Sequence, residues 1–136
     1  MRLLPFINTV IMALILFFPH LAGAEGVFSG TLKGWNCISM GVGCAIDKGD
    51  PHLALEPDIV LVTDETSHYH LTNLPRSIKM KYFKDRVRVF GTAHPRYKAI
   101  LVDKFQVKVE GRYKTIWDAE IERRKQEEEE RIQEAH

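Results

Sequence analysis

Short runs of β-branched and aromatic residues, separated by Gly, Pro, Asn and Asp, follow one another from Gly26 to Trp117 in this chain of 136 residues. In the runs 86–93 and 104–109, apolar and polar residues alternate, which is the period of a strand with one buried face. The runs that read as strands are 27–35, 58–63, 67–72, 86–93, 98–109 and 111–117. Five or six short strands in about 90 residues fit a small closed or partly closed barrel, because closure removes exposed strand edges. The sequence therefore predicts a mainly β fold built on a five- to six-stranded barrel.

Two connections within this region have their own signals. Residues 64–66 have the length and composition of a tight turn, so the strands on either side are expected to form a hairpin. Residues 73–85 are ambiguous, and the sequence allows a turn followed by either a short helix or a strand.

The first 24 residues have the pattern of a secretory signal peptide. Arg2 precedes a long apolar stretch, which ends in the small residues Ala22, Gly23 and Ala24. We expect cleavage near Ala24, export to the periplasm or the exterior, and a mature protein with no membrane-spanning segment. An uncleaved membrane anchor is the alternative, because the apolar stretch is rather long. The chain then divides into a signal peptide (1–24), a barrel domain (25–117) and a charged helical tail (118–136).

The composition changes abruptly at Asp118. From there the chain contains no Gly or Pro and consists almost entirely of good helix formers. Thr115 and Asp118 are the candidates to cap this helix. Only Ile121 and Ile132 are large and apolar, which is too few for a coiled coil or a firmly docked helix. We expect a solvated, charged α-helix, with a partner-binding helix as the alternative.

Most of the region from Val27 to Val109 carries a succession of three motifs. They are FSGTLKGWNC, then HYHLTNLP, then KDRVRVFGTAHPRYKAILVDKFQV, in which a strand ending V-x-V-x-G precedes a turn and another apolar strand. This succession resembles small exported bacterial proteins with an OB-fold-like barrel. The resemblance implies an OB-like fold, but it identifies no subfamily and implies no particular activity.

The only two cysteines, Cys37 and Cys44, stand in a glycine-rich loop. In an exported protein such a pair most often forms a disulfide. Closing this eight-residue ring stabilises the fold by about 2.5 kcal/mol in the chain-entropy model, before any strain is subtracted. Gly41 and Gly43 supply the backbone freedom that a tight ring requires. We therefore expect a disulfide that pins the loop against the barrel.

A zinc or copper site is the alternative role for the cysteines, because thiolate and imidazole groups suit both metals. The candidate ligands are Cys37, Cys44, His52, His68 and His70. His68 and His70 are two positions apart, so on a strand both imidazoles point to one face. The spacing of the cysteines is wider than in structural zinc sites, and the C-x-x-C motif of dithiol redox centres is absent.

Charge is distributed unevenly along the barrel region. Residues 25–75 carry seven acidic and two basic side chains, whereas residues 76–114 carry three acidic and twelve basic ones. Basic residues two positions apart share a face wherever their segment is a strand. The candidate ligand-binding residues are Lys79, Lys81, Arg86, Arg88, Tyr82 and Tyr97. The alternative is an ordinary solvated surface whose charges pair within the fold.

A basic and aromatic surface of this kind resembles the oligonucleotide face of OB-folds, but export argues against intracellular nucleic acid as the ligand. An anionic polymer of the cell envelope or an acidic protein partner fits better, and the acidic tail is a further candidate to cover the surface. The sequence contains no nucleophile elbow, P-loop, dinucleotide fingerprint or H-E-x-x-H motif. We therefore expect a non-enzymatic binding or accessory module without a cofactor. The alternative function is a periplasmic metal-binding or metal-delivery protein.

Overall fold

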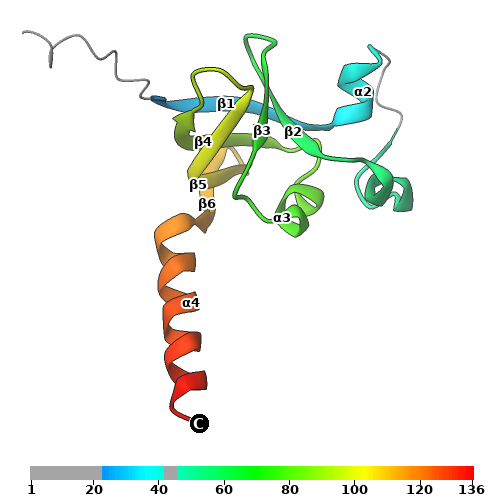
Figure 1. The fold of residues 1–136 in the computed structure, drawn as a ribbon. Coiled ribbons are helices and arrows are strands. Elements are labelled where there is room, and N and C mark those ends of the chain that lie inside the picture. Colours follow the sequence, from blue (N-terminus) through cyan, green and yellow to red (C-terminus); the bar gives the residue numbers. More distant parts are fainter. Residues whose placement is uncertain (1–22, 42–45) are drawn as a thin grey trace, which may run out of the picture.

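The computed structural model describes residues 23–41 and 46–136, and these form a β-barrel with a helix extending from it (Figure 1). The strands are β1 (Ala24–Gly34), β2 (Ile59–Thr63), β3 (His68–Leu71), β4 (Arg86–Ala93), β5 (Ala99–Val109) and β6 (Arg112–Asp118). The helices are α2 (Trp35–Ser39), the 3-10 helix η1 (Pro51–Leu55), α3 (Arg76–Lys81) and α4 (Ala119–Glu134).

The strands form one sheet that closes on itself. Their order is β3-β2-β1-β4-β5-β6, and a parallel pairing between β3 and β5 joins the sheet into a five-stranded barrel. The other neighbouring strands are antiparallel, and β6 adds one strand beyond β5. Helix α3 connects β3 to β4. The predicted fold class is thus confirmed: the protein is mainly β, with an OB-like barrel and a C-terminal helix.

Strand β1 links the two halves of the barrel. Its first residues pair with β4, its last residues pair with β2, and Gly30 and Thr31 pair with both strands. At Gly30, strands β1 and β2 approach so closely that a Cβ atom would lie 1.9 Å from the carbonyl oxygen of Val62. Glycine is therefore required here for lack of space, whatever its backbone angles.

The barrel interior is filled by the apolar residues of the alternating strands. Phe83 and Phe105 are the largest fully buried side chains, and Trp117 on β6 is also buried. Ile78 and Met80 of α3 are partly buried and pack against this core. The remaining core residues are Leu32, Leu53, Ile59, Leu61, Leu71, Leu74, Val87, Val89, Ile100, Val102 and Val107. The period-two pattern therefore turns one side of β4 and β5 inward, and their charged residues lie on the outer side together with Phe90 and Leu101.

The seam between β3 and β5 is short. Only His70 and Leu71 are in register with β5, opposite Ala99 and Ile100. Beyond them, the Asn73 side chain takes the place of a strand residue. Its Nδ2 donates to the carbonyl of Val102, its Oδ1 accepts from the Val102 amide, and both distances are 2.7 Å.

Several local expectations are met and one ambiguous segment is resolved. The hairpin between β2 and β3 is confirmed, and β4 has the bounds that its alternation indicates. The segment 73–85 contains helix α3, so Lys79 and Lys81 are helical and do not share a strand face. Helices α2 and η1 were not expected in the loop that follows β1.

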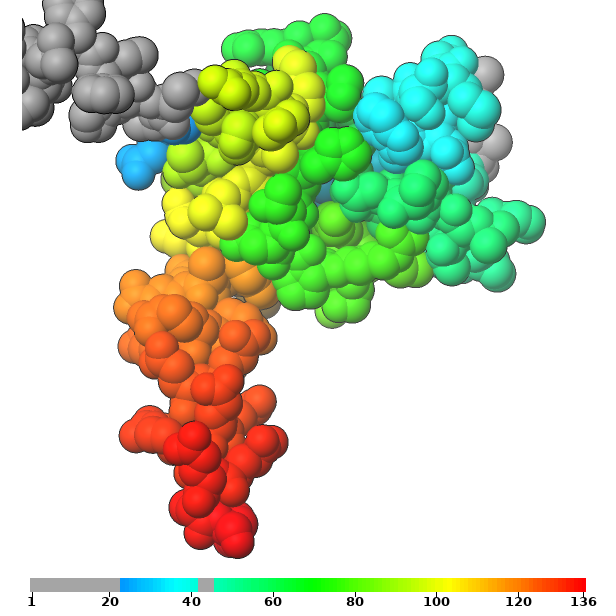
Figure 2. Space-filling view, viewed as in Figure 1, coloured from blue at the N-terminus to red at the C-terminus, as the bar shows by residue number. Residues whose placement is uncertain are grey.

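Helix α4 leaves the barrel at the end of β6 and extends away from it (Figures 1 and 2). Asp118 is its N-cap, because its carboxylate accepts the amides of Glu120 and Ile121. Thr115 does not cap the helix and instead contacts Gln106 across the sheet. Within the described ranges, none of the helices is long and apolar enough to cross a membrane.

Candidate ligand-binding surface

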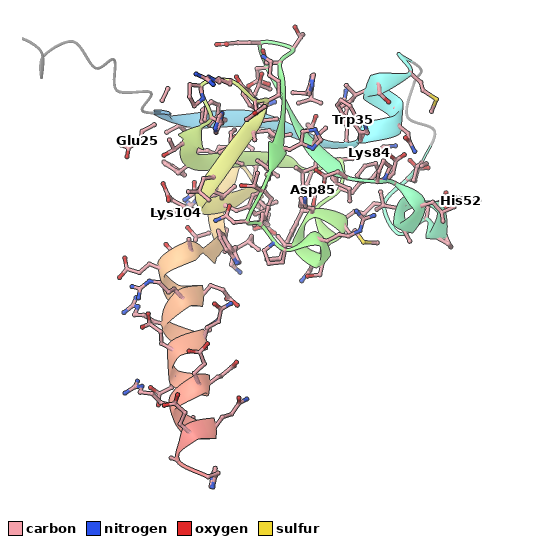
Figure 3. The ribbon with its side chains drawn as sticks, in the orientation of Figure 1. Glu25, Trp35, His52, Lys84, Asp85 and Lys104 are labelled. Carbon is pink, nitrogen blue, oxygen red and sulfur yellow. The ribbon has the colours of Figure 1, made fainter. Side chains whose placement is uncertain are left out.

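Strands β4, β5 and β6 present a cationic and aromatic outer surface, which we call the basic face. It consists of Arg86, Arg88 and Phe90 on β4, Lys104 and Lys108 on β5, and Tyr113 on β6. The register brings these residues together, because Phe90 lies opposite Lys104 and Lys108 lies opposite Tyr113. Lys104 lies close to the base of α4 (Figure 3).

Arg86 is the one member of the basic face that is held by a carboxylate. Its guanidinium donates from both terminal nitrogens to Asp64, which lies in the turn between β2 and β3. These hydrogen bonds lower the pKa of Asp64, and the same contact raises the pKa of Arg86. Both groups are exposed, so we assign this pair to local order at the turn and not to ligand binding.

The other three cations of the basic face contact aromatic rings or solvent. The guanidinium of Arg88 lies 3.8 Å from the centre of the Tyr113 ring, and the Lys104 ammonium lies 5.5 Å from that of Phe90. Lys108 is exposed. None of the three forms an ion pair with any residue in the described part of the chain. Their charges are therefore available to an anionic ligand.

Sequence reasoning found only two members of this face, Arg86 and Arg88. It left out Lys104 and Lys108, although the alternation of β5 already placed them on one outer face and was sufficient to include them. Tyr113 required the pairing of β6 with β5, whose register shifts between Phe105 and Gln106. A shift of this kind leaves no mark in the sequence of either strand.

Three other predicted ligand residues lie away from the basic face. Lys81 is exposed on α3, and Tyr82 follows that helix, where its ring packs 6.2 Å from Phe105. Tyr97 is exposed in the loop between β4 and β5, with its ring 4.6 Å from the His94 ring. The structure therefore does not bring the predicted tyrosines onto one surface with Arg86 and Arg88.

Lys79 was expected at the ligand surface, and the structure corrects this. Its side chain is only 9% exposed, and its ammonium lies 2.6 Å from Oδ1 of Asp58. Helix α3 turns Lys79 toward the barrel and leaves Lys81 outside. Lys79 is thus a buried structural cation that no large ligand reaches.

Asp58 is the centre of a small polar network beneath the loop after β1. Its Oδ2 lies 2.6 Å from Nδ1 of His70, and its Oδ1 accepts from both Lys79 and the Ile59 amide. Partial burial alone would raise the pKa of Asp58, but these hydrogen bonds and the nearby ammonium outweigh burial and lower it. The Asp58 carbonyl also accepts the amide of Trp35, which fixes the start of α2.

Trp35 packs against the two histidines of β3. Its ring centre lies 5.3 Å from that of His68 and 5.1 Å from that of His70. Buried Glu56 holds the same helix by accepting the Asn36 amide at 2.9 Å. Sequence reasoning missed Trp35, Asp58 and Glu56, because their partners are distant in the chain.

The metal-ligand set is only partly assembled in the described residues. His68 and His70 lie side by side against Trp35, whereas His52 is on η1, where its Nδ1 contacts Asp50. Across residues 23–41 and 46–136, no three or more His, Cys, Asp or Glu side chains are grouped to hold a metal ion. Cys44, the remaining candidate, lies outside the described residues.

Cys37 is on α2, and it is not a free thiol. Its expected partner Cys44 lies outside the described residues, so the disulfide between them stays a prediction. The predicted signal peptide, residues 1–24, also falls almost wholly outside the described residues, which begin at Gly23.

We expect the mature protein to be two hydrogens lighter than its reduced mass, to resist alkylation before reduction, and to carry no metal ion. Intact mass spectrometry under native and denaturing conditions, with and without a thiol-alkylating reagent, measures all three properties. Two alkylatable thiols together with a retained metal would instead support the cysteine and histidine metal site.

Comparisons of the chain with protein-family models, with curated proteins and with solved structures found no match. The functional argument therefore rests on the residues of this chain alone.

Proposed function

We propose that the protein is an exported, non-enzymatic binding or accessory module that holds an anionic partner on its basic face. The partner is an anionic polymer of the cell envelope or an acidic protein segment. Export is inferred from the leader-like first 24 residues.

The observation that carries the proposal is the composition of the basic face. Arg88, Lys104 and Lys108 project from two adjacent strands without ion-pair partners in the described chain, and the rings of Phe90 and Tyr113 lie among them. Three unneutralised cations on a rigid sheet raise the local concentration of an anionic ligand, and the rings offer it contact area. The proposed kinship with small exported OB-fold-like bacterial proteins is supported by the strand order and the parallel closure between β3 and β5.

The test is a comparison of two double variants with equal charge change. Lys104→Glu with Lys108→Glu reverses two charges on the basic face, whereas Lys81→Glu with Lys98→Glu reverses two exposed lysines elsewhere. With heparin as the probe, we expect the first variant to bind at least about tenfold more weakly and to show a shallower dependence on salt. The second variant should stay within about threefold of the unmodified protein.

Isothermal titration at several salt concentrations measures both quantities, and a thermal melt verifies that each variant is folded. Equal loss in the two variants would show that only net charge matters, and the basic face would lose its role. If the unmodified protein bound neither heparin nor a polyglutamate peptide, the proposal would be overturned.

A further inference from the structure

We infer that the basic face is also the docking site for helix α4 of a second copy of this chain, so that the protein forms a reciprocal dimer through its acidic tails. This inference rests on the proposed function, because it names an acidic helix as one occupant of the proposed anion-binding surface. It starts from the helix itself.

Helix α4 touches its own barrel at its base, where Ala119 packs against the core and Ile121, Glu122 and Lys125 line a groove with residues 115–118. It is 16 residues long, about 24 Å, and none of its residues is buried. It extends from the barrel as a separate column (Figure 2). An isolated helix of this length is only marginally stable in water, so a docking surface would stabilise it.

One side of α4 combines apolar residues with unpaired acids. Ile121 and Ile132 are 11 residues apart, about three turns, and therefore share a face on which both are roughly half exposed. Glu122 and Glu129 lie two turns apart, about a quarter of the way around the helix from this line, with Lys125 between them and the isoleucines. Neither glutamate forms an ion pair within the described residues. Glu120, Glu127 and Glu128 are paired with arginines of the same helix. Glu130 and Glu134 form no ion pair within the described residues either, but they lie on the side away from the isoleucines.

The basic face has the complementary pattern. Exposed Val27 on β1 lies opposite Phe90, which provides an apolar strip next to the cations. Glu122 and Glu129 are separated by about 10.5 Å along α4. Lys104 and Lys108 are separated by about 13 Å along β5. Flexible lysine side chains cover this difference, so the two pairs can meet.

The helix cannot reach the basic face of its own barrel. Asp118 lies opposite Lys104 at the border of that face, and it is also the N-cap of α4. From this point the helix runs away from the barrel, and folding back would break the cap and the end of β6 (Figure 1). If α4 is the occupant, it must therefore be supplied by another copy. Two copies that exchange tails bury two such contacts, which suits a weak, reversible dimer better than a permanent one.

Sedimentation equilibrium of residues 25–136 tests this inference with three double variants. Glu122→Lys with Glu129→Lys reverses the acidic line, and Lys104→Glu with Lys108→Glu reverses its proposed target. Glu130→Lys with Glu134→Lys changes the tail charge equally on the opposite side of the helix. Circular dichroism verifies that each variant keeps its fold.

We expect the unmodified protein to dimerise at about 50 mM salt and its dissociation constant to rise at least about tenfold at about 500 mM salt. The first two variants should each be monomeric alone, yet form a heterodimer when mixed, because each then meets opposite charge on the other. The third variant should dimerise like the unmodified protein. A monomer at every salt concentration, or no heterodimer on mixing, would overturn the inference.

The proposed function is tested separately by heparin binding. Heparin binding by a protein that never dimerises leaves the proposed function in place and removes this inference. If the protein dimerises and responds to the charge reversals as predicted but does not bind heparin, the docked tail is supported and the external anionic ligand is not.

Discussion

Replacing Gly30 with alanine is expected to lower the free energy of unfolding by about 3 kcal/mol or more. The added Cβ would lie 1.9 Å from the Val62 carbonyl oxygen and 2.7 Å from its carbon, so β1 and β2 would have to separate. Gly30 pairs with Thr63 on one side and Val87 on the other, so the displacement also strains β4. Because a small domain has only about 5 to 15 kcal/mol of stability, this is a large fraction of the whole.

Gly26→Ala is the matched control, because it makes the same change on the same strand. A Cβ at Gly26 would meet only the Phe28 ring, at 3.4 Å. We expect it to change the unfolding free energy by less than about 0.5 kcal/mol. Urea denaturation followed by tryptophan fluorescence measures both variants. Equal stability of the two would show that β1 and β2 can move apart freely at Gly30.

Replacing Asp58 with asparagine is expected to destabilise the protein by about 3 kcal/mol at neutral pH, because it leaves the charge of buried Lys79 without its partner. A second substitution, Lys79→Met, should recover much of this loss, since it removes the stranded charge and keeps the side-chain length. Asp64→Asn is the matched control, because it breaks the exposed pair with Arg86 and should cost less than about 1 kcal/mol.

The same substitution has a defined signature in pH. The contacts of Asp58 lower its pKa in the folded state, so the folded protein binds this proton less readily than the unfolded chain. The stabilisation is therefore present above the unfolded pKa of about 3.9, and it is lost as pH falls through the lower folded value. Urea denaturation at about pH 7 and about pH 3 should show a smaller acid loss in Asp58→Asn than in the unmodified protein. Identical acid losses would contradict the assigned role of Asp58.

Strand β4 and helix α3 show which parts of the fold the sequence predicts and which it leaves open. The alternation in 86–93 gave the bounds of β4 directly, because a strand with one buried face leaves a local signature. The two-residue spacing of Lys79 and Lys81, in contrast, did not indicate whether their segment is a strand or a helix. The segment fits a helix or a strand equally well, and the helix is held by contacts with distant residues, such as that of Lys79 with Asp58, 21 residues earlier, and by the packing of Ile78 and Met80 on the core.

The candidate surface was predictable to a similar degree. Arg86 and Arg88 were correctly placed on one face of a strand, but the partner of Arg86 is Asp64, 22 residues away in a turn. Only the strand order shows that Lys104 and Lys108 lie beside Arg88 and that Tyr97 does not. Pairing between distant segments is set by the whole barrel, so charge counts along the chain locate a basic half but not a basic face.

The short seam between β3 and β5 indicates where local opening of the barrel is easiest. Two registered residues, the amide and hydroxyl of Thr72 and the Asn73 side chain hold it, whereas β1 and β4 share eight paired positions. Strand β3 also shares only two registered positions with β2, so we expect β3 to separate more readily than the longer pairing of β1 with β4 and to admit water to Leu71 and Ile100. The seam uses the first residues of β5, and the basic face uses the last ones. The same strand is therefore loose at one end and fixed at the other, and fluctuations that open the barrel leave the charged surface assembled.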